Sequence, residues 1–246
     1  MIALFTDFGP TGPYVGQMRA VLYRDAPEVP VVDLLCDVPP FNPRAGAHLL
    51  AALASELPED TVFLCVIDPG VGSGDRLPVV VTVDRRRFVG PDNGLFDVVA
   101  ARGRDAQRWE ITWQPPRLVS TFHGRDLFAP VAARLARGVV VEGRHLETRS
   151  AGRGARAAED LLEIIYVDHF GNAMSGVRAG ALPQDGQVVI GGRQLGYAST
   201  YAEVPPGTPF WYANSIGLIE IAVNQGRADE ALGLAPGHPI ELRATA

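Results

Sequence analysis

The chain has 246 residues, 47% of them hydrophobic, which suits one large domain or two modest ones and argues against disorder. Its net charge of −6 argues against nucleic acid as a partner, and its basic residues are all Arg, which excludes a Schiff-base lysine or a lysine-bearing phosphate loop. No apolar run is long enough to span a bilayer and no basic leader precedes the first strand, so we expect a cytoplasmic protein without a membrane partner.

Strands and helices alternate in the first part of the chain. Apolar runs predict strands at 2–5, 31–35, 62–67 and 79–83, and helical patterns cover 14–23, 45–57, 95–101 and a segment ending near 136. Such alternation is typical of a mostly parallel sheet with helices on its faces. We therefore predict an N-terminal α/β domain over residues 1–150.

The pattern changes after a Gly-, Arg- and Ala-rich stretch at 149–156, which is interpreted as a linker. Short strand candidates then follow one another, separated by turn residues, at 162–167, 187–190, 193–197, 209–212 and 218–223. This spacing predicts a smaller, antiparallel and β-barrel-like C-terminal domain over residues 158–246.

One stretch, from Val66 to Ser73, combines a buried strand with a carboxylate. The strand ends at Asp68, where open α/β sheets place their ligands. Pro69, Gly70 and Gly72 disfavour regular structure and let backbone N–H groups approach a ligand. A surface turn capped by Asp68 would explain this stretch alone, but further clusters of the same kind occur along the chain.

These clusters pair polar residues with glycine, most of them at the ends of apolar runs: Thr6–Gly9, Phe122–Asp126, Asp168–Asn172 and Asn214–Gly217. Several such clusters indicate a site more strongly than one turn does. A metal site could be drawn from Asp7, Asp68, His123 and Asp126, but the sequence has no helical His pair or Cys pair to support it, and we predict none. No Gly-x-Ser-x-Gly elbow is present for a Ser–His–Asp triad.

Taken together, the motifs resemble those of the S-adenosyl-L-methionine (SAM) hydroxide adenosyltransferases, or SAM hydrolases, which are relatives of the SAM-dependent fluorinase and chlorinase. The segments that carry the resemblance span nearly the whole chain: Thr6–Gly9, Asp68–Gly72, Gly90–Gly94, Ser120–Asp126, Asp168–Asn172 and Asn214–Gly217. The resemblance implies an N-terminal α/β domain, a C-terminal β domain and a homotrimer with active sites at subunit interfaces.

The resemblance also implies roles for individual residues. Asp68, Arg76 and His123 match the set that handles the attacking water, although the family's Arg often falls one residue earlier, where this chain has Asp75. Asp7 matches the residue that binds the ribose hydroxyls, and Asn172 matches an adenine-binding position. Asp168 and Ser215 match positions that hold the methionine portion, and Asn214 and Asn93 are further substrate-binding candidates.

The function implied is hydrolysis of SAM to adenosine and L-methionine by attack of an activated water at C5′, with SAM as substrate and no cofactor. Two alternatives stay open at this point. A halogenase is disfavoured by Asp68, because an anionic side chain would repel a halide nucleophile. The other alternative is a SAM- or adenosine-binding protein without catalysis.

Overall fold

The computed structural model describes residues 1–147 and 159–244. The chain divides into two compact units, one of Met1–Ala51 and Leu57–Ala158 and the other of Ala52–Glu56 and Glu159–Ala246. The linker expected at 149–156 lies outside the described residues.

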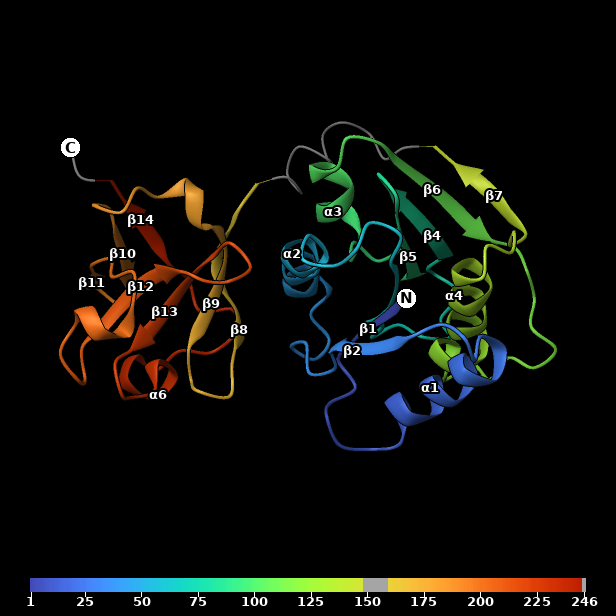
Figure 1. The fold of residues 1–246 in the computed structure, drawn as a ribbon, viewed down its shortest axis with the longest axis horizontal. Helices are drawn as coiled ribbons and strands as arrows, with labels where there is room; N and C mark the ends of the chain where they lie inside the picture. Colours follow the sequence, from blue (N-terminus) through green and yellow to red (C-terminus); the bar gives the residue numbers. More distant parts are fainter. Residues whose placement is uncertain (148–158, 245–246) are drawn as a thin grey trace. The chain divides into compact units, whose positions relative to one another are not determined.

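A seven-stranded sheet forms the centre of the N-terminal unit (Figure 1). Its strands are β1 (Ile2–Thr6), β2 (Val31–Leu35), β3 (Val62–Val66), β4 (Pro78–Val83), β5 (Arg86–Pro91), β6 (Ala106–Ile111) and β7 (Gly143–Leu146). They lie in the order β2-β1-β3-β5-β4-β6-β7.

The sheet is mixed. The neighbours β2, β1, β3 and β5 pair in parallel, as expected, whereas the pairs β5–β4, β4–β6 and β6–β7 are antiparallel. Only Asp84 and Arg85 separate β4 from β5, and Asp84 adopts a φ of 53° in this turn. A parallel pair needs a crossover of a dozen or more residues, so this connection can only form a hairpin.

Helices cover both faces of this sheet. They are α1 (Tyr14–Asp25), α2 (Pro43–Ala54), α3 (Asp97–Arg102) and α4 (Ala129–Ala136), with a π-helical segment η1 (Gly124–Phe128) directly before α4. In Figure 1, α1 and α4 lie on one side of the strands and α2 and α3 on the other. Every residue of β1 and β3 is consequently buried, which explains why these strands are continuous apolar runs.

Two antiparallel sheets form the C-terminal unit. Its strands are β8 (Leu161–Val167), β9 (Ala173–Arg178), β10 (Gln187–Ile190), β11 (Arg193–Leu195), β12 (Pro209–Ala213), β13 (Leu218–Val223) and β14 (Glu241–Arg243). They form a four-stranded sheet in the order β12-β13-β9-β8 and a three-stranded sheet in the order β11-β10-β14. The helical segments are η2 (Ala179–Ala181), η3 (Tyr201–Glu203) and α6 (Ala228–Leu232).

The barrel-like closure expected from the sequence is not found among the described residues. The two sheets remain separate, and only isolated bridges such as Glu163–Pro239 and Tyr197–Trp211 join segments outside the regular ladders. The strands of the smaller sheet have only three or four residues, so they offer few backbone groups for pairing with the larger sheet. Apolar side chains of both sheets, including Trp211, share one core.

Candidate active site

Two carboxylates lie at the same edge of the N-terminal sheet. Asp7 follows β1 directly and Asp68 follows β3 after Ile67, and these adjacent parallel strands pair with Thr6 opposite Val66. Ligands of open α/β sheets bind at this carboxyl edge. Strand pairing thus brings together two residues that are far apart in the sequence.

Asp68 is held by the loop that follows it. Its Oδ1 accepts a hydrogen bond from Nη1 of Arg76 at 3.2 Å and one from the backbone N–H of Gly70 at 3.3 Å. A Cβ on Gly70 would lie 2.6 Å from the same Nη1, so glycine at this position makes room for the guanidinium. The Asp68 side chain is only 8% exposed, against 36% for Arg76. Despite its shifted spacing, Arg76 therefore reaches Asp68.

His123 lies in a loop that is closed by an ion pair. The Asp126 carboxylate accepts the backbone N–H of Val119 at 3.0 Å and two hydrogen bonds from Arg125, at 2.6 and 3.0 Å. Arg125 also donates to Oε1 of Gln17 on α1 at 2.9 Å. Hydrogen bonding by the Arg125 guanidinium holds the pKa of Asp126 below its ordinary value. His123 immediately precedes η1, and π-helical turns are frequent at functional sites.

Two cavities of about 420 Å³ each have Asp68 and His123 in their walls. The first is also lined by Asp7 and by a set of mostly apolar side chains: Phe8, Tyr14, Pro40, Phe41, Val66, Val71 and Phe122. The second is also lined by Arg76 and by the glycine-rich loop after Asp68. Asp68 and His123 thus line both cavities, whereas Asp7 lines the first and Arg76 the second.

Asp7 lies in a partly dehydrated position. Its Oδ2 accepts the backbone N–H of Phe41 at 3.0 Å, and burial raises the pKa of this carboxyl. Phe41 has a φ of 60°, in the left-handed region that non-glycine residues rarely adopt. Such a conformation is costly, and it points the Phe41 amide at Asp7 while its ring lines the first cavity.

Aromatic residues that the sequence analysis did not assign to the site line the same cavity. Phe8, Tyr14 and Phe122 form a triangle with ring centroids 5.4–5.9 Å apart. The guanidinium of Arg125 lies 5.1 Å from the Phe122 ring. Phe8 and Phe122 lie within the polar clusters Thr6–Gly9 and Phe122–Asp126, and this position was the signal that could have identified them.

The side-chain amide of Asn93 hydrogen-bonds to the backbone. Its Nδ2 donates to the carbonyl of Ile67 at 2.7 Å, and its Oδ1 accepts the N–H of Leu95 at 3.3 Å. Asn93 therefore fixes the chain just before Asp68. Its substrate-binding role stays a prediction.

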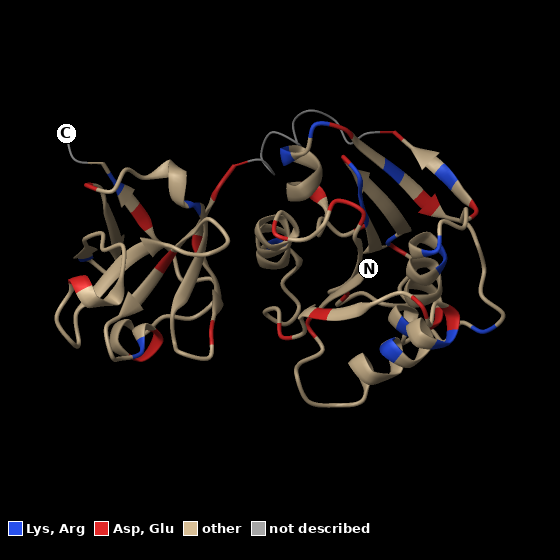
Figure 2. Ribbon diagram, viewed as in Figure 1, with Lys and Arg blue, Asp and Glu red and all other residues tan. Residues whose placement is uncertain are grey.

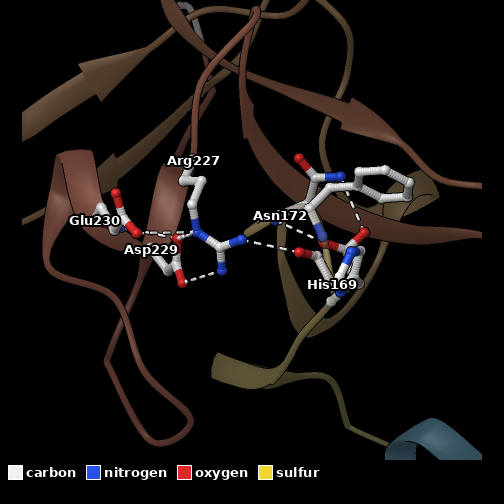
Figure 3. Close-up of polar contacts among 7 residues, drawn as sticks. His169, Asn172, Arg227, Asp229 and Glu230 are labelled. Carbon is white, nitrogen blue, oxygen red and sulfur yellow. Dashed lines mark hydrogen bonds and ion pairs between the residues drawn. The ribbon is translucent and has the colours of Figure 1, made fainter.

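In the C-terminal unit, Asp168 and Asn172 close one turn between β8 and β9. Oδ1 of Asp168 accepts the N–H groups of Phe170 and Asn172 at 2.9 and 2.8 Å, and Oδ2 accepts Nδ2 of Asn172 at 3.0 Å. Figure 3 shows Arg227 reaching from the neighbouring segment to the backbone carbonyl of His169, a contact of 2.8 Å, while its other nitrogens bind Asp229. Side chains within the turn and Arg227 from a neighbouring segment thus hold the turn in one conformation.

The second predicted cluster of this unit is the turn from Asn214 to Leu218. Asn214 Oδ1 accepts the N–H groups of Ile216 and Leu218, and Ser215 is exposed at the tip. The Asn214 Nδ2 group donates to Glu220, a buried carboxylate that the sequence analysis did not single out. Burial raises the pKa of Glu220. A charged residue inside the apolar run of β13 was the available signal.

The negative charge of the chain is unevenly distributed (Figure 2). The segment from residue 159 onwards contains ten Asp or Glu residues and four Arg, so it accounts for the whole net charge of −6. Such a field favours a cationic ligand over an anionic one.

Neither a metal cluster nor a membrane helix is found in the described part of the chain. No group of three or more His, Cys, Asp or Glu side chains is arranged there to hold a metal ion, so Asp7, Asp68, His123 and Asp126 do not form such a group. Among residues 1–147 and 159–244, no helix has the length and apolar character needed to cross a membrane.

Comparison with known proteins places the chain in a family. The N-terminal domain of SAM hydroxide adenosyltransferases matches residues 2–144, and the C-terminal domain of the same family matches residues 162–241. An (R)-S-adenosyl-L-methionine hydrolase from Thermus thermophilus is 40% identical over 98% of both chains. A fluorinase from Actinopolyspora mzabensis is 26% identical over 98% of this chain and 96% of its own.

The fold is also shared with a crystal structure of an uncharacterized conserved protein from Thermotoga maritima. That structure superposes with a TM-score of 0.83 at 31% identity and covers 99% of this chain and 100% of its own. Because both family domains match in order over most of the sequence, the chain belongs to the SAM hydroxide adenosyltransferase family.

Proposed function

We propose that this protein hydrolyses S-adenosyl-L-methionine to adenosine and L-methionine. The observation that carries the proposal is the Arg76-bound carboxylate of Asp68, which shares two cavities with His123 in a chain 40% identical to a named SAM hydrolase. The name of that relative specifies the (R) epimer at sulfur, and we propose the same preference here.

The chemistry requires a positioned water more than a strong acid. The sulfonium at C5′ is already a good leaving group, so methionine departs as a neutral thioether while the water oxygen bonds to C5′. The water must lie in line with the breaking C–S bond and be shielded from bulk solvent. Asp68 or His123 can accept the proton that the water loses, and Arg76 fixes the orientation of the Asp68 carboxylate.

Substrate contacts are proposed for residues of both units. Asp7 would bind the ribose hydroxyls beside the aromatic wall of the first cavity. Asp168 would bind the methionine ammonium, Ser215 its carboxylate and Asn172 the adenine. The excess of negative charge beyond residue 159 supports a substrate with a net positive charge such as SAM.

We further propose that catalysis needs no cofactor or metal, SAM being the substrate, and that neither nucleic acid nor membrane is a partner. EDTA should therefore leave the rate unchanged. A homotrimer with active sites at subunit interfaces, working in the cytoplasm, is proposed from the family resemblance. Light scattering of the purified protein should give three times the chain mass of 26.3 kDa.

The proposal is tested by incubating the purified protein with SAM and separating the products by chromatography. Adenosine and methionine should appear in equal amounts, and the Asp68→Ala variant should produce them far more slowly. Tight SAM binding without adenosine above a heat-killed control would instead favour the binding protein without catalysis.

A halide-using reaction is tested in the same assay. The fluorinase is less similar than the hydrolase, at 26% against 40% identity, and Asp68 would repel a halide. High chloride should therefore yield no 5′-chloro-adenosine. The appearance of 5′-chloro-adenosine as the main product would favour a halogenase over a hydrolase.

A further inference from the structure

The turn that carries Ser215 is shaped by the side chain of Asn214. Oδ1 of Asn214 accepts the N–H of Ile216 at 3.2 Å and that of Leu218 at 2.8 Å. The backbone N–H of Asn214 in turn donates to the Leu218 carbonyl at 2.9 Å. An amide has one oxygen and one NH₂ group, so the turn is closed only when the Asn214 oxygen faces inward.

Glu220 accepts a hydrogen bond from the amino group of this amide. Its Oε2 accepts Nδ2 of Asn214 at 2.7 Å, and its Oε1 accepts the hydroxyl of Tyr212. Glu220 is 2% exposed on β13, directly opposite Tyr212 on β12. The Tyr212 hydroxyl is in turn 3.2 Å from the Tyr201 hydroxyl, so a chain of polar groups holds the Glu220 carboxylate.

We propose that Glu220 is a positioning residue, whose buried carboxylate orients the Asn214 amide and thereby sets the turn that presents Ser215 to the methionine part of the substrate. This inference rests on the proposed function. It assigns Glu220 a part in substrate binding without contact to the substrate. It also makes Asn214 a structural element of the turn, rather than a ligand of SAM.

Exchanging the amide and the carboxylate between positions 214 and 220 tests this relationship. The Asn214→Asp substitution keeps the acceptor that closes the turn but places a second carboxylate against that of Glu220. The two carboxylates should repel, open the turn and raise KM about tenfold or more. Adding Glu220→Gln restores one amide and one carboxylate at this contact, with an oxygen left for the Tyr212 hydroxyl. The double variant should therefore return KM to within about threefold of wild type.

KM is the informative quantity because a purely structural role would not change it. If Glu220 only stabilised the fold, Asn214→Asp would lower the melting temperature and the active fraction, and thus the apparent kcat, while the folded molecules kept their KM. We expect the opposite result for Asn214→Asp: KM rises, while kcat at saturating SAM stays within about threefold of wild type. Glu241→Gln, at an exposed Glu on β14 of the same unit, serves as the control and should change neither quantity.

The result that overturns the inference is a double variant with a KM as high as that of Asn214→Asp alone, because Asn214 would then contact SAM itself. An unchanged KM in Asn214→Asp would overturn it as well. The wild-type protein tests the proposed function separately, through adenosine production. If the wild type binds SAM without turnover, the Kd from calorimetry replaces KM in the same comparison, and if it does not bind SAM the inference fails.

Discussion

Gly72 lies so close to Ser120 that a Cβ on Gly72 would be 2.5 Å from the Ser120 carbonyl oxygen. Gly72 belongs to the loop that follows Asp68, and Ser120 belongs to the loop that leads to His123. The two predicted catalytic segments are therefore in direct backbone contact. Because backbone atoms cannot move aside as a flexible side chain can, this contact fixes the separation of Asp68 and His123.

Gly72→Ala should disrupt catalysis, and Gly74→Ala should not. Both glycines have a positive φ, 81° and 75°, so both substitutions should cost about 1–2 kcal/mol of backbone strain. Only Gly72→Ala also pushes Ser120 away, since a Cβ on Gly74 meets no atom within 4 Å. Steady-state kinetics should show kcat lowered about tenfold or more in Gly72→Ala alone. Equal losses in both variants would show that strain, not the contact, matters.

Asp68→Ala and Asp168→Ala should separate chemistry from binding. Asp68 interacts with the water as it is deprotonated, so its loss should lower kcat more than it raises KM. Asp168 is proposed to hold the methionine ammonium in a charge-assisted hydrogen bond worth about 1.5–3 kcal/mol, so its loss should mainly raise KM. If Asp168→Ala abolished turnover at saturating SAM while KM stayed unchanged, the proposed division of roles would be wrong.

Asp126→Asn should destabilise the protein in a pH-dependent manner. Because the pKa of Asp126 is held below 3.8 in the folded state, its ionised form adds stability above that pH, which is lost as the pH falls through the folded value. The variant should be less stable at pH 7 by about 1.5–3 kcal/mol, and the difference should shrink below pH 4. Urea unfolding at several pH values measures it. A pH-independent difference would contradict the assigned cause.

The His123 loop gives a second measurement on the same variant. Since Asp126 ties Val119 to Arg125 around His123, Asp126→Asn should also lower kcat with little effect on KM. A variant with wild-type kcat at temperatures far below its melting point would show that the ion pair serves stability alone.

Asp7→Asn should have the opposite effect on stability. Burial raises the pKa of Asp7 above 3.8, so ionising this carboxyl lowers the stability of the folded state. This stability is lost as the pH rises through the raised pKa. The variant keeps an acceptor for the Phe41 N–H, and it should match wild type near pH 4 and be more stable at pH 7. Its KM for SAM should nevertheless rise, because the ribose loses an ionised acceptor. A less stable variant at pH 7 would refute this explanation.

Much of the N-terminal fold follows from local pattern. Continuous apolar runs identified β1 and β3, and parallel pairing of their ends explains why Asp7 and Asp68 meet. The hairpin between β4 and β5 departs from the expected alternation because its two-residue connection leaves no room for a helix. The strand β7 was not expected, since Gly143–Leu146 is short, polar and exposed at the sheet edge.

The C-terminal unit shows where sequence patterns stop being informative. The strand β9 was missed because Ala173–Arg178 lacks a clear apolar alternation, and its Gly176 is needed where a Cβ would be 2.5 Å from Leu161. The helix α6 and strand β14 were too short to give a periodic signal. The roles of Arg76 and Glu220 depend on which atoms a side chain reaches across a turn, and no spacing rule encodes that.

The proposed hydrolysis requires that water attack C5′ of SAM in the site around Asp68 and His123. Running the reaction with SAM in water enriched in ¹⁸O, and analysing the adenosine by mass spectrometry, shows whether water supplies the 5′-oxygen. We expect one ¹⁸O atom in the 5′-hydroxyl of adenosine, unlabelled methionine in equal amount, and loss of labelled product in Asp68→Ala. Adenosine without the label, or no adenosine from the wild-type protein, would contradict it.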